Sequence, residues 1–146
     1  MKVIARYLVA SLTLTSLLAA GERPAENSYV ACAVSIKQNS LRAGAAGKIS
    51  ILLTPRRGIH INLVPPVQVK FDSSDAVDSF GAPEIPKRDT TLNTSKPIVV
   101  PVTLRKTAKA GSLTLKGSVT YFYCSETEGW CSKFKQPVEF TVKIVR

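Results

Sequence analysis

The sequence predicts an all-β protein, a two-layer sandwich of about seven to nine short strands. Apolar side chains recur at every second position in several segments, which is the pattern of half-buried strands. Turn residues such as Gly, Pro, Asn and Ser separate these segments. No segment shows the apolar repeat of a helix of useful length, and no internal repeat or heptad pattern is present. A sandwich therefore fits better than any helical architecture.

The N-terminus has the features of an export signal. Lys2 and Arg6 give a positive start, and residues 7–20 form an apolar run interrupted only by Ser and Thr. This run of about 14 residues is too short for a membrane span, which needs about 20. Because small residues at its end suit cleavage, we expect a signal peptide over residues 1–21, with a retained anchor as the alternative. The mature chain, residues 22–146, has the length of one domain, and we expect it to be periplasmic or secreted.

The chain is strongly basic, with a formal net charge of +10. Its basic residues are scattered, with only short clusters at 56–57, 87–88 and 105–106. Scattered charge and export both argue against a nucleic-acid partner. We interpret most of the charge as solvated surface, with attraction to acidic partners or anionic lipid as the alternative.

The first strands follow a short polar tether. Residues 30–36 alternate apolar with smaller side chains, which places Cys32 on the inward face. Residues 47–54 continue the pattern. A further strand at 59–63 must end before the Pro-Pro pair that follows, because proline cannot donate a hydrogen bond to a sheet.

The second half of the chain contains a long connection and then the clearest strands. After a strand at 67–71, residues 72–97 are rich in Asp, Ser, Pro, Thr and Lys and show little periodicity. We expect an irregular connection here with room for one short strand, either a lid over a site or a mobile excursion. Strand character returns at 98–105. Residues 112–123 and 134–145 then alternate on either side of a turn, which predicts a terminal β-hairpin.

Three cysteines in an exported chain allow one intramolecular disulfide and leave one thiol over. Cys124 and Cys131 flank the turn of the terminal hairpin, so folding its strands together brings these side chains close. A Cys32–Cys124 bond would remove more unfolded-chain entropy, about 4.6 against about 2.5 kcal/mol. A disulfide at a hairpin turn is instead open to an attacking thiolate. The position favours a bond used for exchange, with a purely structural bond as the alternative, and we expect Cys32 to be an unreactive buried side chain.

The hairpin around the two cysteines carries a resemblance to a known family. Residues 119–131 read Val-Thr-Tyr-Phe-Tyr-Cys-Ser-Glu-Thr-Glu-Gly-Trp-Cys, with Tyr123 before the first cysteine and Gly129 and Trp130 before the second. This stretch resembles the active-site hairpin of the N-terminal domain of the thiol:disulfide interchange protein DsbD. The wider pattern, with Gly-Ile-His-Ile-Asn at 58–62, is similar over most of the mature chain.

The resemblance implies a fold and a function. The fold is an immunoglobulin-like β-sandwich, and the function is protein-disulfide reductase-type thiol:disulfide exchange in the periplasm. Thioredoxin-fold redox proteins would be electron donor and acceptor, and a membrane-embedded redox partner would be a separate chain. Cys131 would form the mixed disulfide and Cys124 would resolve it. The chain departs from the family in two ways: six residues separate its cysteines, one more than is usual, and residues 72–97 show no match for the acidic-aromatic cap that shields the pair.

Four further residues are predicted to line the site. His60 and Asn62 occupy family positions that line the cysteine pocket, Trp130 is either a hairpin packing residue or a contact for a partner, and Tyr123 either packs its strand or covers the disulfide. With one histidine and one methionine, a copper or zinc site is not expected. We expect no cofactor and no small-molecule substrate, since no Ser-His-acid set or glycine-rich phosphate loop is present. The alternative function is a non-catalytic interaction module in which the disulfide only pins the hairpin.

Overall fold

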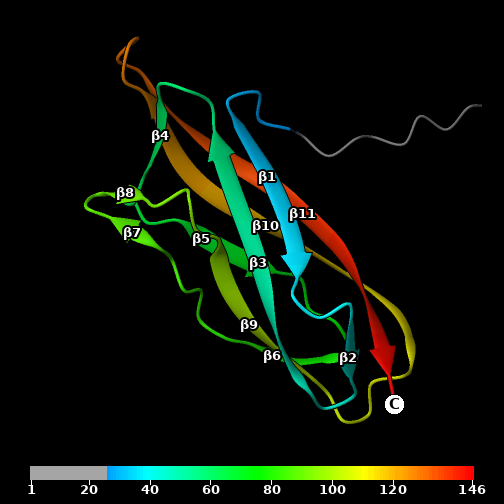
Figure 1. Cartoon of the computed structure of the whole chain (residues 1–146). Helices are drawn as coiled ribbons and strands as arrows, with labels where there is room; N and C mark the ends of the chain where they lie inside the picture. The colour runs from blue at the N-terminus through cyan, green and yellow to red at the C-terminus, as the bar shows by residue number, and fades with distance from the viewer. Residues whose placement is uncertain (1–25) are drawn as a thin grey trace, which may run out of the picture.

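A computed structural model describes residues 26–146, so the predicted signal peptide at 1–21 lies outside the described residues. The described residues form eleven β-strands arranged in two packed sheets, as Figure 1 shows. The predicted all-β sandwich is confirmed. Within the described range no helix is long and apolar enough to cross a membrane.

The smaller sheet has four antiparallel strands, and all the pairs between its neighbours are antiparallel. In spatial order these strands are β1 (Val30–Ile36), β3 (Ala46–Pro55), β9 (Ile98–Leu104) and β6 (Val77–Phe80). Their alternating residues face the second sheet, which explains why Ile49, Ile51 and Leu53 of β3 are almost completely buried.

The larger sheet is built around the terminal hairpin. Its strands in spatial order are β2 (Ser40–Arg42), β11 (Cys131–Val145), β10 (Gly111–Ser125), β4 (Ile59–Asn62), β8 (Thr91–Leu92) and β7 (Lys87–Arg88), and β5 (Gln68–Phe71) also pairs with β10. Strands β10 and β11 cross the whole molecule, so their turn and the C-terminus lie at opposite ends in Figure 1. The sheet buries Leu115, Val119 and Tyr121 against the smaller sheet. Each fully buried large apolar side chain of this kind contributes about 1.5–3 kcal/mol to folding.

The segment 72–97 is more regular than the sequence predicts. It contains β6, β7 and β8, and an isolated bridge joins Glu84 to Val99. Strands β7 and β8 have two residues each, which is too short for an alternating pattern to appear. They form because β8 pairs with β4, so their strand character depends on a neighbour distant in sequence.

The terminal hairpin is longer than predicted at its turn end. The sequence pattern ends its strands at 123 and begins them again at 134, whereas β10 continues to Ser125 and β11 starts at Cys131. Both cysteines are therefore strand residues rather than turn residues.

Candidate functional site

Cys124 and Cys131 form a disulfide at the turn end of the β10–β11 hairpin, which confirms the predicted pairing. The two residues lie directly opposite each other in the strand register, with their Cα atoms 4.1 Å apart. The register runs through fourteen consecutive pairs from Gly111 and Ile144 to the two cysteines. The hairpin ladder thus places both sulfurs side by side without help from any other element.

The turn beyond the disulfide is held by its own hydrogen bonds. The Ser125 amide donates to the Trp130 carbonyl oxygen at 2.9 Å, and the Gly129 amide donates to the Ser125 carbonyl oxygen at 3.0 Å. Gly129 has φ of 69°, a left-handed conformation that glycine adopts at little cost. The Ser125 hydroxyl also accepts from the Glu128 amide at 3.2 Å. These contacts fix the chain reversal between the cysteines.

The two cysteine residues differ in exposure. Cys124 is 5% exposed, whereas Cys131 is exposed. The reason is the strand order: β10 lies between β4 and β11 at this end, but β11 has a second neighbour in the described chain only at Lys143–Val145, where β2 pairs with it. Cys131 therefore lies on a free sheet edge, and an incoming thiolate meets its sulfur first.

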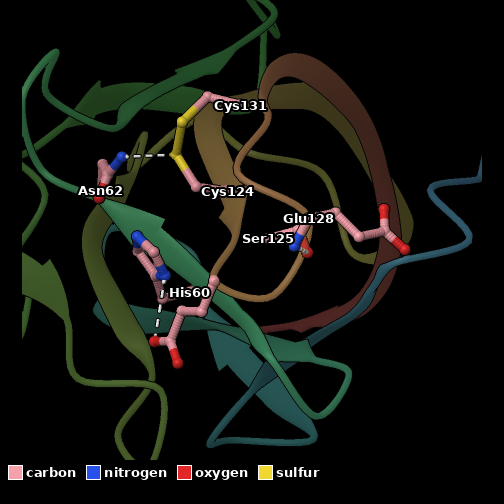
Figure 2. Close-up of a disulfide and its surroundings, with 7 residues drawn as sticks. His60, Asn62, Cys124, Ser125, Glu128 and Cys131 are labelled. Atoms are coloured by element: carbon pink, nitrogen blue, oxygen red, sulfur yellow. Dashed lines mark hydrogen bonds and ion pairs between the residues drawn. A yellow bond between two sulfur atoms is a disulfide. The ribbon is translucent and has the colours of Figure 1, made fainter.

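His60 and Asn62 lie on the same outer face of the larger sheet as the disulfide. In the register, His60 is opposite Cys124 and Asn62 is opposite Phe122, and side chains alternate between the two faces along a strand. The Asn62 Nδ2 group donates to Cys124 Sγ at 3.0 Å, as Figure 2 shows. Asn62 thus contacts the less accessible sulfur.

His60 faces a carboxylate of the hairpin turn. Its Nδ1 lies 3.3 Å from Glu126 Oε1, an ion pair when the imidazole is protonated (Figure 2). That nitrogen is shielded from solvent, and the contact does not have the geometry of a hydrogen bond within the described residues. The turn is also tied to the same neighbouring segment through the backbone, since the Glu126 amide donates to the Gly58 carbonyl oxygen at 3.0 Å.

Tyr123 and Trp130 pack on the opposite side of the hairpin from the disulfide. Tyr123 is buried, and alternation along β10 directs it to the inner face while Cys124 points outward. Trp130 contacts Tyr123 and Tyr29 edge-on, with ring centroids 5.8 and 5.0 Å away, and its Nε1 donates to the Glu128 carboxylate. These contacts show that Tyr123 and Trp130 pack against the inner side of the hairpin.

Tyr29 belongs to this aromatic cluster and is absent from the residues predicted to line the site. It precedes β1, and its carbonyl oxygen accepts a hydrogen bond from the amide of Arg56, the residue after β3, at 2.8 Å. Its ring centroid is 5.9 Å from that of Tyr123. No local sequence signal identifies this contact, since it joins segments far apart in the chain.

Cys32 is the free cysteine of the described chain, and it packs half-buried against the core. Burial raises the pKa of its thiol to about 11, so the thiol remains protonated at neutral pH. Since the thiolate is the reactive form, Cys32 is poorly suited to exchange.

The arrangement suits one type of chemistry. A disulfide with one exposed sulfur can be attacked by an external thiolate, and the buried sulfur then leaves toward a hydrogen-bond donor. In the part of the chain that the structure describes, no group of three or more His, Cys, Asp or Glu residues could hold a metal ion.

Comparisons with known proteins add one structural similarity. No protein-family model matches the chain, and no curated protein matches it either. Among solved structures, the chain is similar to the reduced form of the DsbD N-terminal domain of Neisseria meningitidis, with 18% sequence identity and a TM-score of 0.33. The similarity covers 69% of this chain and 78% of that domain. The residue roles given below therefore rest on the geometry of this chain.

Proposed function

We propose that the chain is an exported thiol:disulfide exchange module, which passes reducing equivalents between thioredoxin-fold proteins through Cys124 and Cys131. One observation carries the proposal: the disulfide joins an exposed cysteine on a free sheet edge to a buried cysteine whose sulfur accepts a hydrogen bond from Asn62. A bond made only to pin the hairpin needs neither feature, because the strand ladder already holds the cysteines in register.

The reaction begins at the exposed sulfur. A donor thiolate attacks Cys131 Sγ, a mixed disulfide forms, and the Cys124–Cys131 bond breaks with its electron pair going to Cys124 Sγ. The Asn62 Nδ2–H is already in place to stabilise the negative charge that develops there.

The second step completes the transfer of two electrons. The donor's other thiolate attacks the donor sulfur of the mixed disulfide and releases Cys131 as a thiolate, which leaves an oxidised donor and a reduced domain. The reverse sequence, started by Cys131 on the disulfide of an acceptor, returns the domain to its oxidised form. Cys131 is thus the residue that forms the mixed disulfide and Cys124 the one that resolves it.

Trapping of the mixed disulfide tests this assignment. We would compare Cys124→Ala and Cys131→Ala, both in a Cys32→Ala background, after incubation with glutathione disulfide, which leaves no second thiol in the adduct. Mass spectrometry counts the adducts. Cys124→Ala should accumulate a stable adduct because its exposed thiol has no resolving partner, and Cys131→Ala should form little. Equal trapping by both variants would refute the assignment.

A further inference from the structure

We propose that the outer face of the larger sheet around the disulfide is a basic docking surface, which selects partners that carry acidic side chains beside their exchanging cysteine. The inference rests on the proposed function and adds the chemistry of the partner to it. The surface consists of four exposed residues, here called the basic frame: Lys70, Arg88, Lys133 and Lys135.

Two members of the basic frame extend along β11 from the exposed sulfur. Because side chains two residues apart share a face of a strand, Lys133 and Lys135 lie on the same outer face as Cys131. At a rise of about 3.3 Å per residue, their Cα atoms are about 7 and about 13 Å along the strand from that of Cys131. Both side chains are long enough to meet a partner bonded to this sulfur.

The row of residues next to the disulfide has a cation at each end. Lys133 is opposite Phe122 on β10, and Phe122 is opposite Asn62 on β4. Asn62 is opposite Thr91 on β8, and Arg88 on β7 ends the row. The Lys133 ammonium lies 5.8 Å from the Phe122 ring centroid, which draws this charge over the sheet. A partner centred on the disulfide therefore meets positive charge on both sides.

The fourth member lies on the side of the face away from the hairpin turn. Lys70 on β5 is opposite Ser118 of β10, which places it on the same outer face as Lys135. Ser118 is six residues from Cys124, about 20 Å along the strand, so Lys70 extends the basic surface beyond the immediate surroundings of the disulfide.

The charges of the basic frame are not neutralised within the described chain. The ion pairs of the described chain join His60 to Glu126 and Lys116 to Glu139, and neither pair includes a residue of the basic frame. Glu126 and Glu128 in the hairpin turn contact His60 and Trp130, and Asp89 lies in the β7–β8 turn; none of the three forms an ion pair with a cation of the frame. Free cations around one sulfur raise the local concentration of anionic partners and speed their encounter, although each exposed ion pair is weak alone.

An acidic protein is the occupant that this arrangement favours. Lys133 and Lys135 extend along β11 from the sulfur at which exchange takes place, and exchange requires a thiol within bonding distance of that sulfur. A lipid headgroup offers the charge but no thiol.

The test uses two synthetic hexapeptides, each with one cysteine, flanked by glutamates in one and by lysines in the other. We would measure the rate at which each reduces the native Cys124–Cys131 bond, divided by its rate with the neutral bis(2-hydroxyethyl) disulfide to remove differences in intrinsic thiol reactivity. At about 0.01 M salt the acidic peptide should react about tenfold faster than the basic one. At about 1 M salt, where the Debye length falls to about 3 Å, the difference should vanish.

Matched variants separate the effect of the basic frame on the reduction rate from the effect of the net charge. Lys133→Gln with Lys135→Gln should remove most of the acidic-peptide advantage. Lys48→Gln with Lys143→Gln changes the net charge equally but alters the smaller sheet and the far end of β11, so it should retain the advantage. At about 1 M salt, dithiothreitol, which attacks as a singly charged thiolate, should reduce all three proteins at the same rate.

Different outcomes refute different proposals. Equal loss in both double variants, or no peptide preference with normal dithiothreitol rates, would refute the docking surface alone. If dithiothreitol cannot reduce the Cys124–Cys131 bond in the folded protein, the proposed function is refuted. Binding to phosphatidylcholine–phosphatidylglycerol vesicles that the first double variant abolishes, without any peptide preference, would assign these lysines to a lipid surface and overturn the proposal.

Discussion

Asn62 connects the sheet to the chemistry of the cysteine pair. Its amide reaches Cys124 Sγ because β4 pairs with β10 on the side of Cys124 that β11 leaves free. A neutral sulfur in a disulfide is a weak acceptor, whereas a thiolate is a strong one. The contact therefore stabilises the leaving group more than the starting bond.

We expect Asn62→Ala to slow reduction of the disulfide by dithiothreitol about tenfold, since a hydrogen bond to a charged group is worth about 1.5–3 kcal/mol. Stopped-flow or timed alkylation measures the rate. Asn93→Ala, in the loop after β8, is the control and should leave the rate unchanged. A rate in Asn62→Ala equal to that of the control would show that this amide has no part in the reaction.

The Cys32 thiol should be unreactive toward alkylating reagents in the native protein. Because burial raises its pKa to about 11, its thiolate is scarce near neutral pH, and alkylation should become faster as pH rises toward that value. We expect iodoacetamide to label the oxidised native protein many-fold more slowly at about pH 8 than the same protein unfolded in guanidinium. Equal labelling rates in the two states would contradict the buried position of this thiol.

Single residues differ in how far the sequence could place them. The cysteine pairing could be predicted because both residues flank one turn, so local chain reversal is enough to join them. The side of the sheet on which Trp130 lies could not be predicted, because Trp130 packs against Tyr29, which lies outside the hairpin. The difference in exposure between Cys124 and Cys131 depends on β4, whose pairing with β10 has no local signal.

At the level of strands, length decides what the sequence reveals. Strands β3, β9, β10 and β11 each repeat the apolar alternation several times, and all four were predicted within a few residues. Strands β7 and β8 show no period because they have two residues each, and they exist through the single pairing of Thr91 with Asn62. Tertiary contacts therefore created the part of the sheet that borders the site.

The junction of β5 with β10 depends on a glycine. A Cβ atom at Gly117 would lie 2.4 Å from the Lys70 carbonyl oxygen and 2.8 Å from Phe71 Cδ1, so the two strands approach more closely than an alanine permits. This contact also positions Lys70 of the basic frame.

We expect Gly117→Ala to lower the free energy of unfolding by about 1–3 kcal/mol through overpacking. Gly129→Ala is the comparison, because a Cβ there meets no atom within 4 Å and only the left-handed backbone is strained. Urea denaturation of both variants should show the larger loss for Gly117→Ala. A smaller loss at Gly117 than at Gly129 would mean that β5 moves aside at little cost.

The whole molecule carries its stability in the core between the sheets, away from the disulfide. The core residues come from both sheets along their full length, and the bond closes only a short loop at one end. A protein that alternates between disulfide and dithiol forms requires this separation, since both forms must stay folded.

The double variant Cys124→Ala with Cys131→Ala should therefore remain folded, with a free energy of unfolding lower by at most about 2.5 kcal/mol. Circular dichroism and urea denaturation measure this against the oxidised protein. A double variant that is unfolded in buffer would indicate a bond on which the fold depends, as the alternative of a structural disulfide requires.

The reduction potential of the Cys124–Cys131 bond tests the exchange function most directly. Residues 22–146 would be equilibrated in graded glutathione and dithiothreitol buffers, and the reduced fraction counted by thiol alkylation. We predict a potential between about −270 and −120 mV, the range of proteins that exchange disulfides. A potential below about −300 mV would mark the bond as structural and contradict the proposed function.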